Sequence, residues 1–226
     1  MRRSEINRIL EQDKDFCAAK GFALPPFAFW APDCWATAGH EYDEIRDNKL
    51  GWDITDYGCG AFWEVGLSLF TIRNGNALQP AKYPKPYCEK LLIIGVDQIT
   101  PAHHHVAKTE DIINRGGGNL CIEVHNSGAA REILDTPVRI NTDGRVYTVD
   151  AGSIVILTPG ESITLPPYLH HKFWGQGETV LCGEVSTVND DEGDNVFIPA
   201  VERFSAIDED EAPVHLLCNE YPSAPS

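Results

Sequence analysis

Residues 103–118 form a dense cluster of chemically active side chains, with the sequence HHHVAKTEDIINRGGG. Side chains alternate along a strand, so His103 and His105 are expected to point to the same face. Lys108 and Glu110 are also two residues apart, so their side chains are expected to share a face. A turn between the histidine pair and this pair would gather all four side chains on one concave surface. Two imidazoles and a carboxylate suit a borderline divalent metal such as Mn, Fe, Co, Ni or Zn. Three ligands do not fill a coordination sphere, so a fourth is expected later in the chain.

The fourth ligand is expected at one of two adjacent histidines. His171 shares a strand face with its apolar neighbours Leu169 and Phe173, whereas His170 shares the other face with Lys172. The more apolar face is expected to line the interior, which favours His171 as the ligand. Three histidines and one glutamate leave one or two positions open, an arrangement typical of a catalytic metal. The same alternation turns His104 away from its neighbours, so we expect His104 and His170 to be exposed or to lie behind the ligands.

Composition limits the classes of partner and the compartment. The chain has 226 residues and a net charge of −16, which disfavours nucleic acid and anionic membranes as partners. No run approaches the roughly 18 apolar residues of a membrane span, and the N-terminus lacks the apolar core of a signal peptide. The seven cysteines are scattered without a CxxC pair, which predicts reduced thiols in a cytoplasmic protein.

The elements that position these residues are mostly strands. An apolar stripe at helical spacing predicts a helix from Ser4 to about Lys20, and Gly51 to Gly60 is typical of a loop. From Phe62 onward short strand-like segments alternate with turn signals, which indicates a β-sandwich or jelly-roll barrel. We expect these segments at 63–73, 87–96, 98–102, 119–125, 138–142, 145–149, 153–157, 162–165, 170–174 and 178–188. The expected organisation is an N-terminal helical and extended segment (1–60), a β-barrel domain (61–205) and an acidic, Pro- and Ser-containing tail (206–226).

The histidine spacing resembles that of a known superfamily. The pattern HxHxxxxExxxxxxG, from His103 to Gly117, resembles the first motif of the cupins, which are small β-barrels. Their second motif orders a glycine, a Pro-Gly turn and a histidine, and Gly152, Pro159-Gly160 and His170-His171 follow that order. The resemblance implies a mainly β, cupin-type jelly-roll barrel, here with an N-terminal helical extension.

Further charged and aromatic residues are candidates for binding a ligand with many hydroxyl groups. Glu184 lies in an otherwise apolar strand, where a buried charge needs a partner. Sugars require many hydrogen bonds together with a flat apolar wall, so we expect substrate-binding roles for Lys90, Trp63, Glu184, Asp191 and Arg203. The acidic run NDDEGD that contains Asp191 and Asp194 is, taken alone, typical of a solvated loop.

Three stretches carry a closer resemblance. PAHHHVAKTEDIINRGGGNL, TPGESITLPPYLHHKFWG and GEVSTVNDDEGDNVF resemble the D-lyxose isomerase family of cupin-fold sugar isomerases. The resemblance implies a manganese-preferring enzyme, with Co²⁺, Zn²⁺ or Fe²⁺ as other possible metals, that is a homodimer. It implies interconversion of D-lyxose with D-xylulose and of D-mannose with D-fructose. The family's metal ligands correspond to His103, His105, Glu110 and His171.

The expected mechanism is proton transfer through a cis-enediolate. Glu202, which lies beside Arg203 after the acidic loop, is the candidate base, and Glu184 can exchange roles with it. Lys108 is the candidate polar partner, either stabilising an oxyanion or shuttling a proton if burial and the metal lower its pKa. A metal-assisted hydride shift is the competing mechanism. The alternative functions are an iron-dependent cupin dioxygenase and a non-catalytic sugar-binding cupin.

Overall fold

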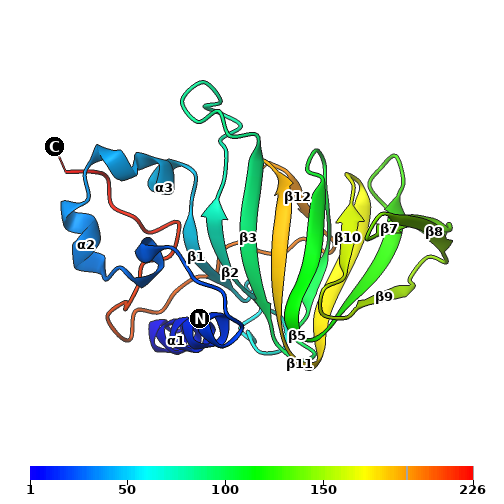
Figure 1. Ribbon diagram of the computed structural model, residues 1–226, viewed down its shortest axis with the longest axis horizontal. Helices are drawn as coiled ribbons and strands as arrows, with labels where there is room; N and C mark the ends of the chain where they lie inside the picture. The colour runs from blue at the N-terminus through cyan, green and yellow to red at the C-terminus, as the bar shows by residue number, and fades with distance from the viewer. Residues whose placement is uncertain (192, 226) are drawn as a thin grey trace.

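The protein is built around one antiparallel β-sheet, seen in a computed structural model that describes residues 1–191 and 193–225 (Figure 1). Its helical segments are α1 (Arg3–Ala19), η1 (Pro26–Phe29), α2 (Pro32–Thr37), η2 (His40–Tyr42) and α3 (Asp43–Asp47). The strands are β1 (Gly51–Thr55), β2 (Leu67–Arg73), β3 (Tyr87–Ile94), β4 (Thr100–His105), β5 (Glu110–Ser127), β6 (Ile133–Leu134), β7 (Val138–Thr142), β8 (Arg145–Val149), β9 (Ile154–Leu157), β10 (Ser162–Leu165), β11 (Leu169–Thr187) and β12 (Asn195–Phe197). The mainly β, cupin-type fold with an N-terminal helical extension is confirmed.

Two long strands connect the parts of the sheet. The strand order is β1-β2-β3-β11-β5-β10-β7-β8, with β4 beside β11, β12 beside β4, and β6 and β9 beside β5. One end of β11 pairs with β3 from Val180 to Thr187, whereas its other end pairs with β4 at His171 and Phe173. Because each end has different neighbours, the sheet curls, and residues of β4 face the same interior as residues of β3.

The long strands differ from the shorter segments that the sequence predicts. Residues 170–174 and 178–188 belong to a single strand, β11, and β5 begins at Glu110 rather than at residue 119. Both strands bend where they pair around Gly117, which has a φ of +100°. Gly117 also lies so close to β11 that a Cβ atom at this position would be 2.0 Å from the carbonyl oxygen of Thr179. Glycine alone tolerates that backbone and that approach, so the strands bend without ending.

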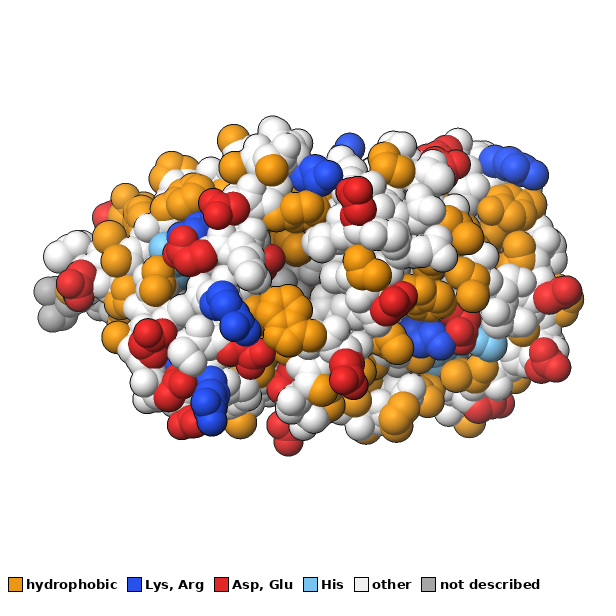
Figure 2. Space-filling view, turned by 90° about the horizontal axis from the view of Figure 1, so that it is seen from below, with side chains coloured by type: hydrophobic (Ala, Val, Ile, Leu, Met, Phe, Trp, Pro, Cys, Tyr) orange, Lys and Arg blue, Asp and Glu red, His pale blue; other side chains and the backbone are white. Residues whose placement is uncertain are grey.

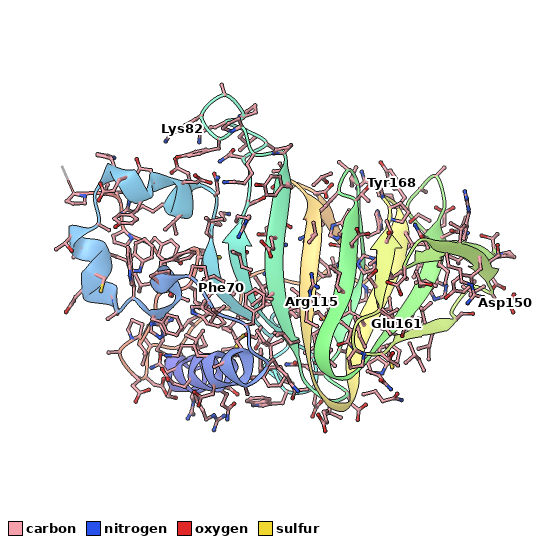
Figure 3. All side chains as sticks on the ribbon, viewed as in Figure 1. Phe70, Lys82, Arg115, Asp150, Glu161 and Tyr168 are labelled. Atoms are coloured by element: carbon pink, nitrogen blue, oxygen red, sulfur yellow. The ribbon has the colours of Figure 1, made fainter. Side chains whose placement is uncertain are left out.

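Residues of β3 separate two hydrophobic cores. Leu92 and Ile94 contribute to a core in the curl of the sheet, whereas Leu91 and Ile93 contribute to a second core against α1. Phe70 of β2, labelled in Figure 3, belongs to this second core and is fully buried. A strand that is covered on both faces shows no alternation of apolar and polar residues. β1, which the sequence predicted to be a loop, is such a strand, and all five of its residues are buried.

The C-terminal segment packs against the helical side of the molecule (Figure 1). The guanidinium of Arg3 in α1 forms an ion pair with Glu209 at 2.7 Å, and the backbone N–H of Cys218 donates to the carbonyl of Trp52 at 2.7 Å. Contacts that join residues more than 160 positions apart bind the two ends of the chain together. The boundaries expected at residues 60 and 205 remain predictions, although β1 already joins the sheet before residue 61.

The surface is mixed in character. Figure 2 shows acidic, basic and apolar side chains scattered over the face seen from below, and the chain as a whole carries a net charge of −16. Within the described residues, no helix is both long enough and apolar enough to span a membrane.

Asp13 is a carboxylic acid on the buried face of α1. Its side chain accepts a hydrogen bond from the hydroxyl of Ser68 on β2 and lines a cavity with apolar residues of the second core, such as Ile9, and with polar Gln98. Burial raises the pKa of Asp13 from 3.8 to about 7, against the opposing effect of Ser68. Folding therefore favours the protonated acid, and this contribution to stability is lost as the pH rises from about 4 to about 7.

We predict that Asp13→Asn stabilises the protein at pH 8 but has little effect at pH 4.5. The amide keeps the hydrogen bond from Ser68 and cannot ionise, so the variant avoids a buried charge worth about 2–4 kcal/mol. Thermal unfolding of both proteins across this pH range should show a difference in Tm that grows with pH to about 5 °C or more. A constant difference would mean that Asp13 does not titrate on folding.

Candidate active site

Four side chains from three strands converge in the interior. His103 and His105 lie at the end of β4, Glu110 begins β5, and His171 lies on β11 directly opposite His103. One donor atom from each residue lies within 4.8 Å of the others, and all four side chains are buried. The Nε2 atoms of His105 and His171 are each 3.2 Å from Oε1 of Glu110. The four ligands expected from spacing and parity are thus brought together.

Hydrogen bonds to the backbone determine which ring nitrogen of His103 and of His171 can bind a metal. Nδ1 of His103 is 2.8 Å from the carbonyl oxygen of Pro101, and Nδ1 of His171 is 2.9 Å from that of Leu169. A carbonyl oxygen only accepts, so in both rings Nδ1 carries the proton and Nε2 presents a lone pair. Burial, reinforced by the neighbouring rings, lowers the pKa of His103 well below 6.5 and keeps the imidazole neutral.

The donor set fits a divalent cation. Burial on its own raises the pKa of Glu110, but Lys108 and His105 hold that pKa well below 4.5, so the group is a carboxylate. Nε2 of His171 is fully buried and has no hydrogen-bond partner among the described residues, because the nearby carboxylate oxygen is also an acceptor. Nε2 of His171 and the carboxylate oxygen face each other without a proton between them, whereas Nε2 of His105 is within hydrogen-bond distance of the same oxygen at 3.2 Å. A divalent cation would satisfy the His171 nitrogen and the carboxylate together, and this donor set suits Mn, Fe, Co or Zn.

A row of alternating charges extends from the metal ligands along the cavity wall. Nζ of Lys108 lies 2.7 Å from Oε2 of Glu110 and 3.0 Å from Oε1 of Glu184. Glu184 also pairs with Lys90 at 3.2 Å, and Nζ of Lys90 donates to the side-chain oxygen of Asn189 at 2.6 Å. The row connects a metal ligand to a second carboxylate through buried ammonium groups.

The row continues on the far side of Asn189. Arg203 pairs with Asp191 at 3.1 Å and with Asp53 of β1 at 2.6 Å. Burial on its own would raise the pKa of Asp191, but Arg203 and Lys90 lower it below 3.8. Asp191 is therefore a carboxylate in the cavity wall, whereas the sequence alone favoured a solvated position for this acidic run.

The charge states of Lys108 and Glu184 determine which of the two can accept a proton. Burial on its own lowers the pKa of Lys108, but Glu110 and Glu184 raise it above 10.5, so the group is an ammonium and not a base. This direction is opposite to the lowered lysine pKa considered from the sequence. Burial raises the pKa of Glu184, but the ammonium groups of Lys108 and Lys90 lower it below 4.5. Glu184 is therefore unprotonated and can accept a proton.

The cavity beside the metal ligands collects most of the expected substrate-binding residues. Its wall includes His103, His105 and Glu110 together with Lys90, Lys108, Glu184, Asp191 and Arg203. Two expected residues do not line it. Trp63 is half exposed, packs on Phe62 and donates to Glu5 at the surface. Glu202 is exposed and lies against Gly58, because Arg203 points inward and the preceding side chain points away from the cavity.

The ligand geometry and the charged row occur in a chain with clear relatives. A model of the D-lyxose isomerase family matches residues 1–221. A D-lyxose/D-mannose isomerase from Serratia proteamaculans is 47% identical over 225 residues, which cover 98% of each chain. Another from Escherichia coli O157:H7 is 46% identical, again covering 98% of each chain. The chain belongs to the D-lyxose isomerase family. The expected class of enzyme, an aldose–ketose isomerase, is thereby confirmed.

Solved structures support the fold. An L-ribose isomerase from Cellulomonas parahominis, solved with L-psicose, superposes with a TM-score of 0.59 at 16% identity and covers 92% of this chain and 98% of its own. An Acinetobacter sp. DL28 L-ribose isomerase with L-ribose gives a TM-score of 0.58 at 17% identity, covering 91% and 98%. At these identities the likeness establishes a shared cupin-like fold.

Two further histidines pair on the opposite face of the sheet from the metal ligands. Nδ1 of His104 lies 3.3 Å from Nδ1 of His170, and Nε2 of His170 is 3.2 Å from the carbonyl oxygen of Arg131. Tyr168, at the position labelled in Figure 3, packs its ring 5.7 Å from that of His104. Both histidines are at most 1% exposed, so they lie behind the ligands and not at the surface. Their hydrogen bond joins β4 to β11.

Several residues of the site escape the sequence analysis. Asp53, Tyr57, Asn189, Asn195 and Phe197 take part in the row or line the cavity. Asp53 had a detectable signal, since it is a lone charge in the apolar run GWDIT, as Glu184 is in its own strand. The others become part of the site through pairing of β12 with β4 and through loop positions, which leave no local pattern.

We predict that His171→Ala abolishes tight binding of divalent metal whereas His170→Ala preserves it. The first change removes a ligand, so affinity for Mn²⁺ should fall by more than the roughly 10–100-fold typical of losing an outer contact. The second change leaves the ligands in place but removes the hydrogen-bond partner of Nδ1 of His104, which lowers the free energy of unfolding by about 1–3 kcal/mol. Isothermal titration with Mn²⁺ and thermal unfolding measure the two effects. Metal binding lost in His170→Ala but kept in His171→Ala would contradict the ligand set.

Proposed function

We propose that this protein is a divalent-metal-dependent aldose–ketose isomerase that interconverts D-lyxose with D-xylulose, and D-mannose with D-fructose. The observation that carries the proposal is one cavity whose wall brings three residues of the four-residue metal cluster together with an ammonium group and a carboxylate. The cluster supplies the Lewis-acid site, and Lys108 and Glu184 supply a proton donor and a proton acceptor. The relatives that carry the D-lyxose/D-mannose isomerase name support the choice of sugars.

The cavity wall matches a polyhydroxylated ligand. Charged donors and acceptors alternate along it, so neighbouring hydroxyl groups of a sugar can each donate to one side chain and accept from the next. Nη1 of Arg203 and Oδ1 of Asn195 are fully buried in this wall and have no hydrogen-bond partner among the described residues. Sugar hydroxyls would satisfy both atoms, and an analogue that lacked them would leave a buried polar group unpaired. Phe173 and Phe197 add apolar surface.

Each charged residue has a distinct part in the reaction. A divalent ion held by the four ligands would polarise the carbonyl and the adjacent hydroxyl and so acidify the hydrogen on C2. The carboxylate of Glu184 takes that proton from C2 of the aldose and returns it to C1 of the resulting enediolate. The ammonium of Lys108 gives a proton to O1 and recovers one from O2, so both residues end unchanged. Lys90 holds Glu184 in place.

The assignment of the base to Glu184 replaces Glu202. Glu184 is 4% exposed, lies in the cavity wall and is an ionised carboxylate, whereas Glu202 is exposed outside the cavity. A base must come within hydrogen-bond reach of the proton that it removes. Glu184 shares Lys108 with the metal ligand Glu110, which holds it close to the atoms that the metal would bind.

The proposal extends to the metal, the assembly and the compartment. Manganese is the proposed metal, since its affinity for oxygen ligands suits one carboxylate and the open positions where sugar oxygens would bind. A homodimer is proposed because Val146 of β8 and Ile154 and Ile156 of β9, two strands that follow one another in the chain, are each about half exposed. Location in the cytoplasm is proposed from the seven free cysteines, five of them buried.

We predict that the protein, incubated with Mn²⁺ and D-lyxose without oxygen, forms D-xylulose. In D₂O the product should carry deuterium at C1, because Glu184 exchanges its proton with solvent before returning it. Mass spectrometry and proton NMR of the ketose measure both results. Product without solvent deuterium would favour the hydride shift over the enediolate. Absence of any ketose, from either D-lyxose or D-mannose, would refute the proposed function, and a requirement for oxygen would favour the dioxygenase.

We predict that Glu184→Gln lowers kcat by about 10²- to 10⁴-fold, the usual contribution of a positioned base. Glu202→Gln is the matched control, since it makes the same chemical change on an exposed side chain, and its kcat should stay within about twofold of the parent value. Steady-state kinetics on D-lyxose, with Mn²⁺ affinity measured in parallel, separates loss of the base from loss of the metal. A large loss in Glu202→Gln with little in Glu184→Gln would return the base to Glu202.

A further inference from the structure

The three ligand histidines differ in what lies on the far side of each ring. His103 and His171 each have Nδ1 within hydrogen-bond distance of the carbonyl oxygen two residues earlier on their own strand. Nδ1 of His105 has no such partner and is fully buried, without a hydrogen bond among the described residues. The carboxylate of Asp194 faces it, with Oδ2 at 3.7 Å. The His105 ring therefore lies between two carboxylates outside its own strand, with Glu110 3.2 Å from Nε2 and Asp194 3.7 Å from Nδ1.

Asp194 is fixed in place by the loop that separates the metal ligands. Its Oδ1 accepts the backbone N–H of Ala107 at 2.6 Å, and its Oδ2 accepts that of Lys108 at 3.1 Å. Its own carbonyl accepts the N–H of Val106 at 3.1 Å. The next residue, Asn195, begins β12 and pairs directly with His105 of β4. Asp194 is 8% exposed, so a residue of the acidic run expected in solvent is buried beside the site.

We propose that Asp194 is the positioning residue of the metal centre: its carboxylate accepts the Nδ1–H of His105, which fixes the ring and leaves Nε2 free to bind metal. The inference rests on the metal centre of the proposed function and not on the identity of the sugar. A carboxylate that accepts the N–H of a histidine ligand fixes the proton on that ring nitrogen. The other ring nitrogen then becomes a stronger ligand for the metal. Asp194 acts on His105 alone, since the other two rings use backbone carbonyls.

The same carboxylate also fixes the catalytic ammonium relative to the metal. The loop of residues 106–109 carries Lys108 between two metal ligands, and Asp194 accepts the backbone N–H groups of Ala107 and of Lys108 itself. A change at Asp194 would therefore move His105 and Lys108 together. If Asp194 only held the loop in place, its substitution would move Lys108 but leave the tautomer of His105 unchanged. This difference makes the proposal testable.

The test uses Asp194→Asn, with Thr187→Val as matched control. Asparagine keeps the size of the side chain, but its amide donates where the carboxylate accepted, which favours the His105 tautomer with the proton on Nε2. Thr187 accepts the N–H of Thr109 in the same loop at 3.3 Å, so Thr187→Val loosens the loop without facing His105. Two-bond ¹H–¹⁵N spectra of the metal-free proteins report the tautomer, and His105→Gln assigns the signal. Isothermal titration gives the affinity for Mn²⁺.

The expected result is a wild-type His105 protonated on Nδ1, a shift toward Nε2–H in Asp194→Asn, and Mn²⁺ binding weakened about 10- to 100-fold. Thr187→Val should keep the tautomer and an affinity within about twofold of wild type. A wild-type His105 protonated mainly on Nε2 overturns the proposal, even if the variant fails to fold. Unchanged affinity in a folded Asp194→Asn also overturns it. Mn²⁺ binding without isomerase activity would refute the proposed function but not this inference.

Discussion

The site depends on the burial of one carboxylate. Glu110 is 3% exposed, and a carboxylate withdrawn from water is strongly destabilised unless charges or donors compensate it. Lys108 compensates Oε2, whereas Oε1 lies 3.2 Å from Nε2 of His105, within hydrogen-bond distance, and 3.2 Å from the lone pair on Nε2 of His171. A lone pair cannot stabilise a negative oxygen, so a cation beside His171 would complete the compensation on this side of the carboxylate. The metal position and the ammonium are two parts of one electrostatic balance around Glu110.

The backbone supplies this arrangement through the pairing of β4 with β11. Because side chains alternate, His103 and His171 meet inside the curl, while His104 and His170 meet on the other face and join the same two strands. The four-residue loop after His105 then returns the chain to β5. One short connection therefore places two metal ligands and the ammonium within a few residues, which explains why this stretch is so dense in function.

Periodicity and spacing were enough to predict that four side chains converge in a candidate metal cluster, because His103, His105 and Glu110 are close in sequence and His171 lies on the expected face of its strand. The mainly β class and α1 were also predictable, from short strand signals and a helical stripe. β1 was not, since a strand buried on both faces has no alternation. Glu202 was preferred as the base because Arg203 beside it suggested a site, but neighbouring residues of extended backbone point to opposite sides. Asp194 was misread because its burial depends on β12 pairing with β4, about ninety residues earlier.

The environment of Glu184 determines how strong a base it can be. Two ammonium groups, those of Lys108 and Lys90, lower its pKa, which guarantees the carboxylate form but weakens its pull on a proton. Such a base is poorly matched to a hydrogen on a sugar carbon, unless the carbonyl beside that carbon is strongly polarised. Lys108 also contacts Glu110, so the group that weakens the base belongs to the same network as the metal ligands. Under the proposed mechanism the reaction would therefore depend on a bound cation for acidity at C2, and the buried row of charges would link activity to metal binding.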